Sequence, residues 1–290
     1  MISQNLINEY IPGAVNTFKK VMPPISTPYP IIRIASAETL KSVRSELVEL
    51  TGSTSSSNTA PFKSVMETFH GDKGDAILIY QKNCPEDQDE FNHFLWHELG
   101  HFYSIANDVN NLHHLINEEL SVGEANLRHI GYWFWCEFVA ESISNYVEEK
   151  ACPIDKETIK TNWRKIYGRI QYLIQLSNSH SEYSFNEYDL AFFYATVLTN
   201  QSALAFIDLS LNDKIEVRDP YAFNLIPKDF QPYLLKILYL LIDKVNEEPF
   251  WIIDGEFLVR LGQIIRELNY KKTSIACMYG SKPHFTPTPE

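Results

Sequence analysis

Two histidines and a glutamate near residue 100 have the types and the spacing that zinc chemistry needs. The chain reads His97-Glu98-Leu99-Gly100-His101, which matches the pattern H-E-x-x-H. On a helix, His97 and His101 project from one face a turn apart, so their ring nitrogens can take adjacent corners of a Zn²⁺ tetrahedron. Glu98 lies about 100° further around the helix. The pattern therefore predicts two metal ligands and a general base that touches water without binding the metal.

The residues around this pattern predict an amphipathic helix. Its apolar positions recur at helical spacing on a face different from that of the two histidines: Phe91, Phe94, Leu95, Leu99 and Phe102. Gly100 costs about 1 kcal/mol in a helix interior, and we expect it to let another backbone come close to the metal. His93, one turn before His97, is interpreted as a surface residue.

A catalytic zinc ion has three protein ligands and one open position, so a further ligand is required. Ser104 and Asn107 stand where the metzincin pattern H-E-x-x-H-x-x-G-x-x-H needs a glycine and a histidine, which excludes that pattern. A later segment, 133–145, predicts an aromatic helix that carries Glu137 and Glu141 four residues apart on one face. One of these two carboxylates is the expected third ligand.

This arrangement resembles the gluzincin group of zinc metallopeptidases. In that group H-E-x-x-H lies on one helix and a glutamate ligand lies on a following helix, often with an acidic residue four positions later. Glu137-Phe-Val-Ala-Glu141 is similar to the group's pattern E-x-x-A/S-D, with Glu in the Asp place. The resemblance covers roughly residues 75–150. It implies Glu137 as the third ligand and Glu141 as the acceptor that orients a ligand histidine.

A second register is also open. Glu141-Ser-Ile-Ser-Asn145 is similar to E-x-x-S-D with Asn in the last place, which would make Glu141 the ligand. We favour Glu137, because the partner of a ligand histidine must accept its N–H and fix its tautomer. Glu141 supplies a carboxylate for that task, whereas Asn145 does not.

The resemblance implies a zinc-dependent peptidase that acts on a peptide or protein substrate. Glu98 would take a proton from water and return it to the leaving amine, with Zn²⁺ polarising the carbonyl. His180, Tyr183 and Tyr188 are conceivable donors to the oxyanion, although 16 tyrosines leave that choice open. We expect residues 76–80 to form an edge strand that an extended peptide joins.

The alternative is a zincin-like regulatory or binding protein that acts on a single specific partner with little general proteolysis. A long helical second half without motifs motivates this alternative. Glu98 argues against a scaffold that has lost catalysis, because a scaffold has no need of the general base.

The elements that position these residues predict an α+β fold, and the resemblance to gluzincins implies a zincin-like core. Strands are expected at 31–35, 63–70 and 76–81, the last two joined as a hairpin. Residues 108–128 read as an irregular connection, and helices are expected at 130–150, 156–177, 186–199, 201–211, 229–246 and 254–269. Residues 1–150 are expected to carry the sheet and the metal site. Residues 151–290 are expected to form a helical part packed as one unit with the first.

Composition and charge argue against several classes of binding partner. The formal net charge of −12 argues against nucleic-acid binding and against adsorption to an anionic membrane. Four cysteines without C-x-x-C spacing predict neither a disulfide framework nor a zinc ribbon. No secretory signal and no apolar run of membrane-spanning length is visible, so we expect a cytoplasmic protein. The oligomeric state is left open.

Overall fold

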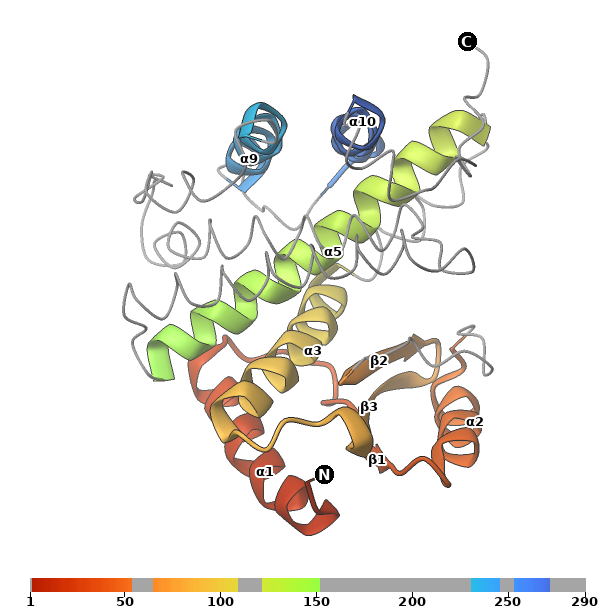
Figure 1. Cartoon of the computed structure of the whole chain (residues 1–290), viewed down its shortest axis with the longest axis vertical. Coiled ribbons are helices and arrows are strands. Elements are labelled where there is room, and N and C mark those ends of the chain that lie inside the picture. Colours follow the sequence, from red (N-terminus) through yellow and green to blue (C-terminus); the bar gives the residue numbers. More distant parts are fainter. Residues whose placement is uncertain (1, 54–64, 109–121, 152–230, 246–252, 272–290) are drawn as a thin grey trace, which may run out of the picture. The chain divides into compact units, whose positions relative to one another are not determined.

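The computed structural model describes residues 2–53, 65–108, 122–151, 231–245 and 253–271. Within these ranges the fold is mixed α+β, with one three-stranded sheet and a majority of helix (Figure 1). The predicted α+β class is confirmed. The chain divides into two compact units, 1–107 with 139–153, and 108–138 with 154–290.

The sheet of the first unit contains β1 (Ile31–Ala35), β2 (Met66–Gly71) and β3 (Gly74–Tyr80) in the order β1-β3-β2. β3 pairs parallel with β1 and antiparallel with β2. The expectation that residues 76–80 form an edge strand is therefore wrong, because β3 is central. Its run of apolar residues is buried on both faces, which is typical of a strand with neighbours on both sides. Among the described strands, β1 and β2 are the edges.

Helices cover both faces of this sheet. α2 (Leu40–Thr51) packs on one face, where its Leu47 shares a core with apolar side chains of the strands: Ala35, Phe69, Ala76, Leu78 and Tyr80. Side chains alternate along a strand, so Thr68 points to the opposite face from Phe69. There Thr68 contacts Glu98 of α3 (Gln88–Asp108). The sheet thus lies between α2 and the helix that carries the H-E-x-x-H pattern (Figure 1).

α3 buries the apolar face that its sequence predicts. Phe91, Leu95, Leu99 and Phe102 are fully buried, whereas Phe94 is partly exposed. α1 (Gln4–Val21) packs against this helix: the indole Nε1 of Trp96 donates to the carbonyl of Ala14 at 3.0 Å. With its apolar side fixed in this way, α3 presents its two histidines on another side.

α5 (Val122–Ala151) is one continuous helix, and the boundary between the two units passes through it after Phe138. It begins eight residues before the predicted start at Ile130, so the expectation of an irregular connection is wrong for residues 122–128. Polar residues in this segment look like a loop in the sequence, but they belong to the helix. Arg128 is buried there, and its guanidinium lies 3.9 Å from the carboxylate of Glu124. Residues 109–121 lie outside the described ranges.

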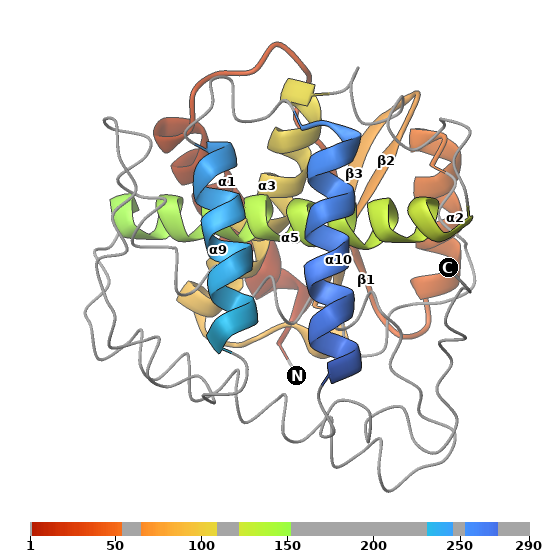
Figure 2. The ribbon, with the colours of Figure 1, turned by 90° about the horizontal axis from the view of Figure 1, so that it is seen from above.

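The second unit contains the first part of α5 together with α9 (Gln231–Val245) and α10 (Gly255–Lys271). α9 and α10 lie side by side (Figure 2). Trp135 of α5 packs edge-on against Phe257 of α10, with ring centroids 5.2 Å apart. The helices predicted at 229–246 and 254–269 are confirmed over residues 231–245 and 255–269, which the structure describes. Those predicted at 156–177, 186–199 and 201–211 lie outside the described residues, so the division at residue 150 stays a prediction.

None of the described helices combines the length with the apolar character that a membrane-spanning helix needs.

Candidate metal centre

His97 and His101 come together on one side of α3. Their ring centroids are 4.7 Å apart and their Nε2 atoms are 3.1 Å apart. Only 12% of the His97 side chain is exposed, so its ring has little freedom to turn away. Two nitrogens bound to one tetrahedral zinc at about 2.0–2.1 Å would stand roughly 3.3 Å apart. The separation of the two Nε2 atoms therefore suits a shared metal ion.

Glu137 completes a group of three possible ligands. One atom from each of His97, His101 and Glu137 can be chosen so that all three lie within 4.8 Å of one another. Glu137 stands on α5 two residues before Val139, where the helix joins the unit that contains α3. The structure thus brings together the three residues that the sequence singled out as ligands.

Glu141 lies on the other ring nitrogen of His97. Its Oε2 is 2.8 Å from Nδ1 of His97. Because a carboxylate accepts, Nδ1 must carry the proton, which leaves the lone pair of Nε2 free to bind a metal. Asn145 instead donates its amide to the backbone carbonyl of Glu141 at 2.9 Å. This geometry favours the register with Glu137 as ligand over the register with Glu141 and Asn145.

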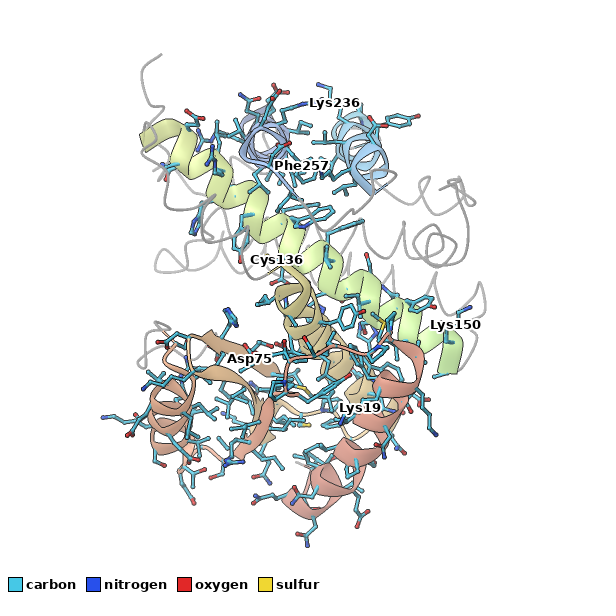
Figure 3. The ribbon with its side chains drawn as sticks, turned by 180° about the vertical axis from the view of Figure 1, so that it is seen from behind. Lys19, Asp75, Cys136, Lys150, Lys236 and Phe257 are labelled. Carbon is cyan, nitrogen blue, oxygen red and sulfur yellow. The ribbon has the colours of Figure 1, made fainter. Side chains whose placement is uncertain are left out.

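α3 and α5 pass close to each other beside these residues. A Cβ atom built on Gly100 would lie 2.7 Å from the carbonyl oxygen of Ala140, closer than Cβ atoms are found in proteins. The expected close backbone approach at Gly100 is present, and Ala140 precedes Glu141 directly. The part of α5 that belongs to the same unit as α3 runs from Val139 to its end beside Lys150 (Figure 3).

Glu98, the predicted general base, is held by the sheet. The hydroxyl of Thr68 on β2 lies 2.6 Å from Oε2 of Glu98 and 3.2 Å from its backbone carbonyl oxygen. A threonine hydroxyl has one proton to donate, and the shorter contact assigns it to the carboxylate. One carboxylate oxygen is therefore fixed while the other is left for a different partner. Sequence reasoning missed Thr68, because no spacing relates a strand residue to a helix residue 30 positions later.

His93 was interpreted as a surface residue, and that interpretation is wrong. Only 25% of its side chain is exposed, and its Nε2 and Nδ1 lie 3.3 Å and 2.9 Å from carboxylate oxygens of Glu141 and Glu148. Burial alone would lower the pKa of His93, but the two carboxylates outweigh it and raise that pKa to about 10. For Glu141, burial alone would raise the pKa, but His93 and His97 outweigh this effect and hold the pKa of Glu141 well below its usual range.

A signal for His93 and Glu148 was present in the spacing. His93 precedes His97 by four residues and Glu148 follows Glu141 by seven, which places each pair on one helix face. The conceivable oxyanion donors His180, Tyr183 and Tyr188 lie outside the described residues.

No protein-family model matches the chain, and neither the curated proteins nor the solved structures include a match to it.

Proposed function

We propose that this chain is a zinc-dependent peptidase with a zincin-like core, whose metal is held by His97, His101 and Glu137. One observation carries the proposal. Two imidazole nitrogens and a carboxylate converge within 4.8 Å, while the far nitrogen of His97 faces Glu141 at 2.8 Å. Lone pairs of two Nε2 atoms at 3.1 Å repel each other unless a proton or a cation lies between them.

The donor set suits zinc. Two histidines and one glutamate are a usual ligand set of catalytic zinc sites, in which a fourth position stays open for water or substrate. A zinc ion bound there supplies a Lewis acid that polarises a carbonyl and makes water acidic near neutral pH. His97 and His101 fix its place through their Nε2 atoms. Glu137 contributes the negative charge that partly balances the cation.

Glu98 acts as the general base in this proposal. Its position one residue after His97 directs its carboxylate to the side of the metal ligands without making it a ligand. It takes a proton from water during attack on the peptide carbonyl, and it later gives a proton to the leaving amine. The hydrogen bond from Thr68 keeps the carboxylate in one rotamer for both steps.

The edge strand that we expect an extended peptide to join is β2 and not β3. β2 is an edge among the described strands, and it carries Thr68, which contacts the general base. An extended peptide that adds to a sheet edge receives main-chain hydrogen bonds along its length. A peptide along β2 would therefore pass next to Glu98.

The test compares zinc-loaded wild type with Glu98→Gln on a mixture of unstructured peptides, with cleavage products identified by mass spectrometry. The variant keeps the shape of the side chain and removes its basicity. We expect it to retain zinc and to lose hydrolysis by about 10²–10⁴-fold. Glu90→Gln, an exposed change on the same helix, is the matched control and should cleave like wild type. Equal cleavage by Glu98→Gln, or no cleavage by zinc-loaded wild type, would contradict the proposal.

A further inference from the structure

His93 sits between two glutamates of α5, although it belongs to neither the ligand set nor the general base. Its Nε2 is 3.3 Å from Oε1 of Glu141, and its Nδ1 is 2.9 Å from Oε2 of Glu148. The same Glu141 uses its other oxygen, Oε2, on His97 at 2.8 Å. Four side chains thus form an unbroken series from a metal ligand outward: His97, Glu141, His93 and Glu148.

We propose that His93 is a positioning residue of the metal centre, which holds Glu141 in the orientation that presents His97 to the metal. The proposal rests on the metal site proposed above. It assigns His93 no contact with metal or substrate, since its effect passes through Glu141.

The two carboxylate oxygens of Glu141 face different histidines. Its side chain is only 8% exposed, so water reaches it poorly and its oxygens need protein donors. Each oxygen has one histidine donor. If His93 is removed, Oε1 loses its donor, and the carboxylate becomes free to rotate toward whatever else can satisfy it. Rotation withdraws Oε2 from Nδ1 of His97, which weakens the control of that ring's tautomer and direction.

His93 is itself held by several side chains of α5. Because each ring nitrogen faces a carboxylate oxygen, both nitrogens donate. The hydroxyl of Ser144 lies 3.2 Å from its Nδ1 and donates to its backbone carbonyl at 2.9 Å. Glu141, Ser144 and Glu148 all come from α5, so one helix fixes the ring of a residue on the other. A side chain with this many partners is suited to hold another group in place.

Positioning and electrostatics predict opposite signs for the change in zinc affinity when His93 is replaced. Replacing His93 by a neutral residue makes the surroundings of the site more negative, which by charge alone would strengthen binding of a cation. Loss of the orientation of His97, in contrast, would weaken binding of the cation. The sign of the change in zinc affinity therefore decides between the two effects.

The experiment uses the full chain, Zn²⁺ in competition with a chromogenic chelator, and the visible absorption of Co²⁺ as a probe of ligand geometry. We expect His93→Leu, which leaves Oε1 of Glu141 without a donor, to bind zinc about 10–100-fold more weakly than wild type and to show altered Co²⁺ bands. Glu148→Gln keeps an acceptor for Nδ1, so a smaller loss in the same direction is expected. Glu90→Gln on α3 is the control and should match wild type in both measurements.

Thermal unfolding in excess chelator measures whether the variants fold when metal is absent. If His93 only joins two helices, His93→Leu will lower the unfolding temperature without metal and leave zinc affinity and the Co²⁺ spectrum unchanged. That result, or tighter zinc binding, would overturn the inference while leaving the proposed function intact. Failure of wild type to bind zinc at all would instead overturn both. Should His93→Leu fail to fold, wild-type zinc affinity in Glu148→Gln would overturn the inference.

Discussion

At His97 the two ring nitrogens have different tasks. Nδ1 donates to Glu141 at 2.8 Å, and Nε2 faces the Nε2 of His101 at 3.1 Å. A single proton on the far side of the ring thus decides which atom can bind a cation. The same logic applies to Glu98, where Thr68 occupies one carboxylate oxygen. In both residues, one half of the functional group is fixed so that the other half has a defined direction.

Replacing Thr68 separates Glu98, the proposed general base, from the side chain that holds it. Thr68→Val removes the hydroxyl with little change of shape, so Glu98 gains rotamer freedom while the proposed metal ligands stay in place. A hydrogen bond to a charged group is worth about 1.5–3 kcal/mol, and we expect the rate of peptide hydrolysis to fall at least about tenfold. Thr68→Ser keeps a hydroxyl and should recover most of the rate. Measured zinc affinity should be equal in wild type and both variants, and a parallel loss of zinc would contradict this role.

The helices α3 and α5 pass close to each other at Gly100. A Cβ there would meet the backbone of Ala140, with its carbonyl oxygen at 2.7 Å. Backbone cannot move aside as a flexible side chain can, so the two helices would have to separate. This close approach allows side chains of α3 to contact Glu141, which directly follows Ala140 on α5.

Gly100→Ala should therefore destabilise the protein despite the better helix propensity of alanine. Overpacking of this kind costs about 1–3 kcal/mol. Gly13→Ala in α1 is the matched control, since nothing lies within 4 Å of a Cβ at that position; it should stabilise by roughly 0.5–1 kcal/mol. Urea unfolding of metal-free protein gives both free energies. A stabilising Gly100→Ala would show that the two helices are not held in this close contact.

Much of the fold could be predicted from the sequence, and the limits have physical causes. β1 and α3 have clear periodicity, and their positions follow from it. The central place of β3 was missed because strand order depends on pairing partners, although the apolar run in β3 already indicated burial on both faces. The early start of α5 was missed because polar residues on a helix look like a loop when their partners are unknown. Contacts between helices, such as His93 with Glu148, depend on which faces meet.

For the candidate site, the sequence predicted the residues that share a helix and not those that approach from elsewhere. His97, Glu98 and His101 follow from spacing on one helix, and Glu137 with Glu141 follow from spacing on the next. Thr68 comes from a strand, so no local pattern could identify it. Gly100 was an informative exception, because a costly glycine in a helix interior indicated a close neighbour before that neighbour was known.

At the scale of the whole molecule, α5 is the element that connects the two compact units, since the boundary between them falls inside it after Phe138. Glu137 stands at that point of the helix, and Glu141 stands one turn later. A ligand that binds the native state and not the unfolded state stabilises the protein in proportion to the logarithm of its concentration over Kd. Metal binding by His97, His101 and Glu137 would therefore couple occupancy of the site to the stability of the folded chain.

The most direct test is a calorimetric titration of Zn²⁺ into metal-free wild type, Glu137→Gln and Glu141→Gln. We predict one zinc per chain in wild type, a loss of binding at the same concentrations in Glu137→Gln because a ligand is removed, and a reduction of about 10–100-fold in Glu141→Gln because the support of His97 is weakened. Absence of zinc binding in wild type, or equal affinity in all three proteins, would contradict the assignment of this centre.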